Sequence, residues 1–417
     1  MKQKSYSKKF ITYGIGQAFN LISPLLVLPY LVKICGEEGF GKIGVGFSIS
    51  FILIVIVDFS SYHTGIKQLV DHKNNVYKTK LLIVKHLSAK LLLFLLVIGV
   101  VSVLMLFPYL KTQFKLILSS LVIVFSSILN PNWILQAQEK FLANSVFNVA
   151  SKLIYLISIF LFINTKELYF FVPFLYGIGI IIPSVYFWIK YYSLYQINFF
   201  DLNVNDGIQL IKADYKLCLS QLFFAFRQYS PVLIIDFILG SFVAGQFRII
   251  EQLIMIFRTF FQILFRFSFS VICNLISRNL EKGVILWKKI NSLALLFVLL
   301  LVLIIYTNSF IFLKYFNFDL NNGKLEFLFK FSLLLPLFIG SNFAMEQLLF
   351  SFNKIRIYNN ITYTTTLISF TILVIFTIFW SLFGAILALL ITELFLIIIY
   401  TKFLWQNINP KTKAQID

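Results

Sequence analysis

The segment INSLALLFVLLLVLIIY, from Ile290 to Tyr306, decides the structural class of this protein. It contains no charged residue, and as a helix it is long enough to cross a hydrocarbon core of about 30 Å. Similar apolar runs recur along the whole chain of 417 residues. Strands of a membrane barrel would alternate apolar and polar residues, and these runs do not. The sequence therefore predicts an all-α integral membrane protein.

The overall composition agrees with this class. Hydrophobic residues make up 59% of the chain and charged residues 13%, and the mean hydropathy is +0.88. Soluble domains usually contain about 25% charged residues, because most of their surface faces water. The cysteines Cys35, Cys218 and Cys273 occur singly and lack the spacing of a metal site or disulfide framework. We therefore expect neither a bound metal nor a resident cofactor.

The apolar runs predict about twelve transmembrane helices, each long enough to span the bilayer. The predicted spans are Phe10–Val32, Ile43–Ile66, Leu81–Phe107, Phe114–Gln136, Val146–Ile163, Tyr169–Tyr191, Tyr215–Leu239, Gly245–Ile276, Ile290–Tyr306, Leu325–Phe350, Ile357–Trp380 and Gly384–Trp405.

The basic residues follow the predicted topology. The formal net charge is +19, and most Lys and Arg residues lie in every second connection between the apolar runs. Such a bias marks cytoplasmic segments of a membrane protein, which face an anionic leaflet. It predicts that both termini are cytoplasmic. A nucleic-acid partner is not expected, because the charges do not gather on one polar face.

An internal repeat divides the predicted helices into two halves. The first helix ends in GEEGFG, which begins at Gly36, and the seventh ends in GSFVAG, which begins at Gly240. The same shift places Gly41 on Gly245, Gln17 on Gln221 and Lys85 on Lys289. Because the halves keep the same orientation, the sequence predicts two six-helix bundles related by a parallel repeat. The predicted bundles are residues 1–192 and 214–417, joined by a cytoplasmic linker at 193–213.

Charged residues inside the predicted spans are candidates for function, because ionisable groups in a membrane usually face a wet interior. Arg248, Arg258 and Arg266 fall on about one third of the circumference of the eighth helix, at about 100° per residue. Glu251, Gln252 and Gln262 share that face, and Arg227 adds a further cation from the seventh helix. This pattern predicts a cationic cavity that suits a phosphate or diphosphate, because arginine binds such groups through paired hydrogen bonds. Alternatively, Arg248 and Arg266 reach the headgroups and Arg258 pairs with Glu251.

Two further groups complete the predicted sites. Asn148 and Lys152 lie on a polar face of the fifth helix that could bind sugars or hold neighbouring helices together. The candidates for ion or proton coupling are Asp58, Glu251, Glu346 and Glu393, although each could instead be a local ion-pair partner.

Four stretches of the chain together point to a known family. They are NLISPLLVLPYL from Asn20, running into Gly36–Gly41; DFSSYHTGIK from Asp58; NPNWILQAQEK from Asn130; and DFILGSFVAG from Asp236. The chain resembles the O-antigen or capsule repeat-unit flippases (Wzx type) of the multidrug/oligosaccharidyl-lipid/polysaccharide exporter superfamily. In one respect it differs, because Ser60 stands where the family's second helix often has glycine.

The resemblance implies a flippase of the bacterial inner membrane. Such a protein moves an undecaprenyl-diphosphate-linked oligosaccharide to the periplasmic leaflet for O-antigen lipopolysaccharide or capsule biosynthesis. It implies alternating access through a central cationic cavity, coupling to a proton or sodium gradient, and no catalytic residue. The implied partners are the lipid-linked oligosaccharide, membrane lipid, a polysaccharide polymerase and a chain-length regulator.

Two other functions compete with the flippase. A drug or metabolite exporter of the same architecture would favour an acidic or apolar cavity, which the predicted arginines oppose. A membrane polysaccharide polymerase or ligase would need a substantial outer loop with catalytic Arg or His. The longest predicted outer segment, around Asn308 to Lys324, is too short for such a loop.

Overall fold

The computed structural model describes residues 2–72, 75–197, 201–316, 323–352 and 354–408, and these residues form helices and connections without strands. The chain forms two compact units, Met1–Leu233 and Ile234–Asp417. The predicted all-α class is confirmed. The predicted bundle boundaries at 192 and 214 stay predictions.

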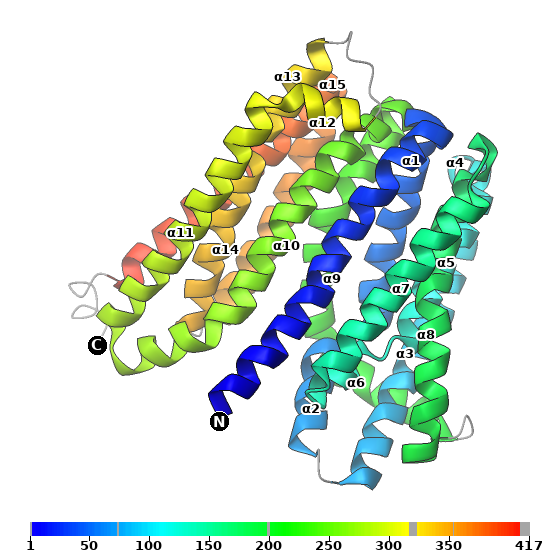
Figure 1. Cartoon of the computed structure of the whole chain (residues 1–417), viewed down its shortest axis with the longest axis vertical. Coiled ribbons are helices and arrows are strands. Elements are labelled where there is room, and N and C mark those ends of the chain that lie inside the picture. Colours follow the sequence, from blue (N-terminus) through cyan, green and yellow to red (C-terminus); the bar gives the residue numbers. More distant parts are fainter. Residues whose placement is uncertain (1, 73–74, 198–200, 317–322, 353, 409–417) are drawn as a thin grey trace. The chain divides into compact units, whose positions relative to one another are not determined.

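The first unit is built from helices whose regular stretches are interrupted at several points (Figure 1). The elements are α1 (Lys2–Asp58), η1 (Ser61–Gly65), α2 (Ile66–Asp71), α3 (Val76–Leu104), α4 (Pro108–Thr112), α5 (Phe114–Leu129), α6 (Asn132–Ala137), α7 (Phe141–Phe162), η2 (Lys166–Phe170), α8 (Phe171–Tyr195) and α9 (Val204–Leu239), which contains the boundary between the units. Within this unit α8 packs beside α5 and α7, and α7 also packs against α1.

The second unit continues with longer helices. They are α10 (Ser241–Arg278), α11 (Leu280–Thr307), α12 (Ser309–Tyr315), α13 (Gly323–Ser332), α14 (Leu335–Ser351) and α15 (Ile355–Ile408). Here α10 packs beside α11 and α14, and α14 packs against α15 (Figure 1).

The described helices account for the predicted number of spans. Nine segments are long and apolar enough to cross a membrane, and a bent pair, Ser241–Phe269 with Val271–Arg278, raises the number to ten. Both α1 and α15 contain two helices, because non-helical residues interrupt α1 at Gly36 and α15 at Trp380 and Ser381. The described chain therefore contains about twelve helices that can span a membrane, as predicted.

The outer faces of these helices suit contact with lipid. On α11, large apolar side chains recur along one side of the helix, and each is more than half exposed. They are Leu293, Leu296, Leu300 and Ile304. Water would penalise such a continuous apolar surface, whereas lipid does not. The protein is therefore a multi-pass membrane protein.

Two backbone features occur at matching places in the two units. Gly36 and Gly240 are the two glycines with positive φ in the described part of the chain. In addition, the span of α5 and α6 breaks beside Pro131, and the span of α13 and α14 breaks beside Pro336. Proline cannot donate the backbone hydrogen bond that a continuous helix requires, so it marks each break. Both features support the predicted repeat.

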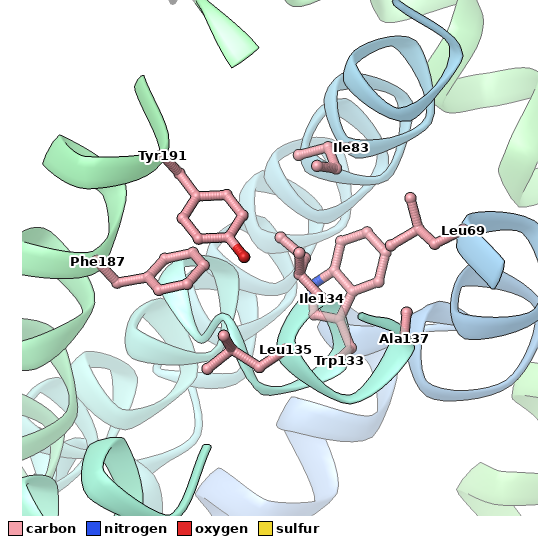
Figure 2. Close-up of a cluster of buried hydrophobic side chains, with 8 residues drawn as sticks. All are labelled: Leu69, Ile83, Trp133, Ile134, Leu135, Ala137, Phe187 and Tyr191. Carbon is pink, nitrogen blue, oxygen red and sulfur yellow. The ribbon is translucent and has the colours of Figure 1, made fainter. Parts of the chain in front are cut away.

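An apolar cluster fixes the short helices α2 and α6 in the first unit. Trp133 is fully buried, and Figure 2 shows its indole beside Leu69, with Phe187 and Tyr191 across Ile134 from it. Close packing of these side chains provides dispersion contacts, so this cluster stabilises the interrupted end of the α5–α6 span. The indole of Trp133 also lies beside the buried charges described next.

Candidate functional site

The most deeply buried charge in the described first unit is Lys90, which lies within α3. Its Nζ is 2.7 Å from Oδ1 of Asp58, and the exposed fractions of the two side chains are 1% and 17%. Asp58 was predicted as a coupling residue, whereas Lys90 was not predicted to have a role. The available signal was a lysine in the middle of the apolar run Leu81–Phe107, where a charge needs a partner.

Lys90 lies where two helices end. Asp58 is the last residue of the regular part of α1, and Phe59 follows with φ 49° before the π-helix η1 begins. The Nζ of Lys90 also donates to the backbone oxygen of Ser127 at 3.3 Å, in the last turn of α5. The last carbonyl oxygens of a helix have no partner within that helix and carry partial negative charge. A cation between two such ends is therefore favourably placed.

Aromatic rings complete the surroundings of the Lys90 ammonium. Its Nζ is 5.8 Å from the ring centroid of Trp133, and the His86 ring lies 4.9 Å from the same indole. The Nδ1 of His86 is 3.2 Å from Oγ of Ser61 in the π-helix. A Cβ atom on Gly65 would lie only 2.9 Å from Cε1 of His86. This site is therefore packed closely, and glycine at position 65 leaves room for the imidazole.

The beginning of α9 is attached to the same region. Oγ1 of Thr64 donates to Oδ2 of Asp214 at 2.6 Å, and the backbone nitrogen of Asn203 donates to Oγ of Ser88 at 3.1 Å. Lys80 pairs with Asp201 at 2.8 Å. These contacts connect the first part of α9, and the segment that precedes it, with η1 and α3.

A second polar group lies at the end of α6. The hydroxyl of Tyr191 donates to Gln138, Nε2 of Gln138 donates to Tyr195 at 2.8 Å, and Nζ of Lys140 donates to Tyr191 at 3.2 Å. Partial burial, reinforced by the nearby Lys190, lowers the pKa of Lys140. The basic connection after α6 is thus held against the aromatic end of α8.

Asn148 belongs to a triangle of amides. Its Nδ2 donates to Oδ1 of Asn144 at 2.9 Å, and its Oδ1 accepts from Nδ2 of Asn132 at 2.9 Å. Nδ2 of Asn144 closes the triangle on Oδ1 of Asn132 at 3.2 Å. The amide of Asn148 thereby joins α7 to α6. Its predicted contact with sugar stays a prediction.

Lys152 lies one turn further along α7 and contacts Tyr176 of α8. Its Nζ donates to the tyrosine hydroxyl at 2.6 Å and lies 3.9 Å from the ring centroid. Arg227 of α9 is half-buried, with its guanidinium 5.6 Å from the ring centroid of Phe224. Both cations thus lie against aromatic rings within the first unit. The face of such a ring attracts positive charge.

The predicted arginine face lies on α10 in the second unit. Arg248 is buried and pairs with Glu251 three residues later on the same helix. Further along α10, Arg258 is half-buried and Arg266 is exposed. The alternative considered from sequence paired Glu251 with Arg258, and the structure pairs it with Arg248. The assignment of these arginines to a cavity stays a prediction.

The other predicted carboxylates make contacts within the second unit. The hydroxyl of Tyr400 donates to Oε1 of Glu346 at 3.3 Å. Nδ2 of Asn342 donates to Oε2 of Glu393 at 2.5 Å and to the backbone oxygen of Glu393 at 3.0 Å. Both contacts join α14 to the second helix of α15. The structure places Glu346 and Glu393 in this unit with Glu251, whereas Asp58 lies in the first unit.

Gln347 was not predicted from the sequence. Its Nε2 donates to Oγ of Ser268 at 2.8 Å and to the backbone oxygen of Phe265 at 3.2 Å, and its Oε1 accepts from Nδ2 of Asn291 at 3.1 Å. One buried amide thus connects α10, α11 and α14. A glutamine inside an apolar span gives only a weak signal of such a role, because its partners lie on other helices.

Comparison with known proteins identifies the fold first. The chain is 14% identical to an inward-facing multidrug resistance MATE family transporter of the MOP superfamily, with a TM-score of 0.71, covering 98% of this chain and 96% of that one. It is 16% identical to the MATE multidrug transporter DinF-BH, with a TM-score of 0.64, covering 96% and 95%. The protein therefore has the fold of MOP superfamily transporters.

The family follows from the sequence. The model of the family described as polysaccharide biosynthesis protein matches residues 7–264, and the chain belongs to this family. It is also 26% identical over 166 residues to the "Putative O-antigen transporter" of Escherichia coli (strain K12). That match spans 39% of this chain and 40% of the relative's length. The resemblance to Wzx-type flippases of the MOP superfamily is thus confirmed.

Proposed function

We propose that this protein is a flippase that moves undecaprenyl-diphosphate-linked oligosaccharide repeat units across the bacterial inner membrane for O-antigen or capsule biosynthesis. Family membership and the MOP transporter fold support a role in export. Transport of this kind breaks no covalent bond, so the proposal assigns no catalytic residue. The basic bias of alternate connections favours cytoplasmic termini.

The observation that carries the proposal is the row of guanidinium groups on α10. Arg248 is buried, Arg258 is half-buried and Arg266 is exposed along one side of this helix. They interrupt an apolar segment of the kind that normally excludes charge. A diphosphate offers several oxygen acceptors to which arginine can form paired, charge-assisted hydrogen bonds. We propose that these arginines, with Arg227 on α9, line the cationic cavity through which the headgroup passes. Lys152 and Asn148 would contribute contacts to the sugars.

Coupling to a proton or sodium gradient would require a carboxylate that takes up and releases a proton, or binds and releases Na⁺, during transport. Asp58, Glu251, Glu346 and Glu393 are the proposed candidates. The substrate class further implies a polysaccharide polymerase and a chain-length regulator acting after the flippase.

The proposal is tested in a strain from which the gene has been deleted. Expression of the Arg258→Ala variant should give at least a ten-fold loss of surface polysaccharide while the protein remains in the membrane, and Arg258→Lys should restore part of it. Arg278→Ala is the matched control, because Arg278 is exposed in the last turn of the same helix. Normal surface polysaccharide in the Arg258→Ala strain would contradict the proposed role of Arg258.

The same strain separates the flippase from a drug or metabolite exporter. Loss of the flippase should leave lipid-linked repeat units on the inner leaflet, because synthesis continues without transfer. A deletion strain that instead kept its surface polysaccharide and became sensitive to cationic drugs would favour the exporter.

A further inference from the structure

Lys90 is unusual because a fully buried ammonium group is among the most costly groups to place in a membrane protein. Three groups compensate that cost in the described structure. They are the carboxylate of Asp58 at 2.7 Å, the backbone oxygen of Ser127 at 3.3 Å and the ring of Trp133 at 5.8 Å from Nζ. Two oxygen ligands and an aromatic face are also the kinds of group that bind a small monovalent cation.

The backbone explains why negative potential gathers at this point. The regular part of α1 ends at Asp58, and α5 ends at Leu129 before the interruption at Pro131. Ends of broken membrane helices coordinate Na⁺ in transporters through carbonyl oxygens that have lost their helical partners. Lys90 places its ammonium at the meeting point of two such ends.

The internal repeat provides an independent comparison. The shift that places Gly36 on Gly240 places Asp58 on Gln262 and Lys90 on Ala294. Neither charge is present at the matching positions of the second half. The carboxylate and the ammonium are therefore present together in one half and absent together in the other. This pattern indicates that each charge is the partner of the other.

We propose that Lys90 is a tethered cation: its ammonium occupies a monovalent-cation position formed by the Asp58 carboxylate, the Ser127 carbonyl and the Trp133 ring, so that the wild-type protein binds neither Na⁺ nor K⁺ there. The chemistry of the position would take Na⁺ or a small alkylammonium once the lysine side chain is removed. The proposal concerns the ion and is independent of the transported substrate. Sodium coupling, if it operates, would then use a carboxylate other than Asp58.

The test measures thermal stability of the purified full-length protein in detergent, at constant ionic strength, in NaCl, KCl, choline chloride or propylammonium chloride. Propylammonium resembles the end of the missing lysine side chain. The melting temperature of the wild-type protein should be the same in choline chloride and propylammonium chloride, and any rise in NaCl or KCl should persist when Asp58 and Lys90 are both replaced. The Lys90→Ala variant should melt lower in choline chloride, and propylammonium or Na⁺ should raise its melting temperature by about 2–5 °C in a saturable manner.

The Asp58→Asn/Lys90→Ala variant is the matched control, because it removes both charges. It should show no response to Na⁺ or propylammonium beyond that of the wild-type protein. The proposal is overturned if Na⁺ stabilises the wild-type protein over choline in an Asp58-dependent manner, or if folded Lys90→Ala responds to no cation. If Lys90→Ala does not fold, Asp58→Asn/Lys90→Met should fold, since it leaves no unpaired charge. Failure of this double variant as well would assign Lys90 a packing role and overturn the proposal.

Discussion

Gly36 and Gly240 adopt nearly the same unusual backbone conformation, with φ 70° and ψ 174° at Gly36 and φ 87° and ψ 166° at Gly240. A Cβ atom at either position would meet no atom within 4 Å. The need for glycine therefore arises from the backbone angles, because this region is occupied essentially only by glycine. The two halves of the chain thus use the same backbone device where the first and second helices of each half meet.

Replacement of either glycine by alanine should destabilise the protein by about 1–3 kcal/mol, which is the usual cost of a side chain at such angles. The measurement is the melting temperature of purified Gly36→Ala and Gly240→Ala. Gly99→Ala is the control, since Gly99 is an exposed residue inside α3 where an added Cβ would meet no atom within 4 Å. That control should be neutral or slightly stabilising. Equal effects at all three positions would contradict the backbone explanation.

Gly340 is required for a different reason: a neighbouring side chain leaves no space for a Cβ atom. A Cβ atom there would lie 2.2 Å from Cζ of the buried Phe261, where α14 crosses α10. Gly340→Ala should therefore destabilise the second unit by about 1–3 kcal/mol through overpacking. Phe261→Leu in the same protein should recover part of that loss, and a double-mutant cycle measures the recovery. Purely additive effects would show that the two residues do not compete for the same space.

The helices were predictable from sequence because each span is encoded locally by an apolar run. The reversal at Gly36 and the repeat at Gly240 were also predictable, since the glycines stand at matching positions. The ion pair of Lys90 with Asp58 was not predictable, because its partners are far apart in sequence and the pairing depends on how α3 packs against the end of α1. A charge within an apolar run indicates that a partner exists without identifying it.

The arginine face of α10 shows the same limit. Helical periodicity places Arg248, Arg258 and Glu251 on one side. The alternative prediction paired Glu251 with Arg258, seven residues away, although Arg248 at three residues is the nearer neighbour on a helix. The structure pairs Glu251 with Arg248, three residues away. Periodicity therefore predicts which side chains share a face, whereas rotamers and neighbouring helices decide which of them pair.

The side chain of Gln347 should stabilise the packing of three helices of the second unit through its hydrogen bonds. Gln347→Leu keeps a similar volume but leaves Oγ of Ser268 without its donor. It also removes one of the two acceptors of Asn291 Nδ2, which keeps the Trp287 backbone oxygen. The expected loss is about 1–3 kcal/mol, because unsatisfied buried polar groups are costly. Thr371→Val is the control, since the exposed Thr371 hydroxyl donates to the backbone of its own helix at 3.1 Å. The melting temperatures should separate the two variants clearly.

The amide triangle distinguishes a structural role of Asn148 from the predicted contact with sugar. Asn148→Ala removes the acceptor of Asn132 and the donor to Asn144, so it should destabilise the protein by about 1–3 kcal/mol. Asn144→Ala breaks the same triangle and should lower the melting temperature by a similar amount. If Asn148 also binds substrate, Asn148→Ala should reduce surface polysaccharide more than Asn144→Ala does at equal amounts of folded protein. An unchanged melting temperature in both variants would contradict the structural role, and equal polysaccharide in both would remove Asn148 from the substrate site.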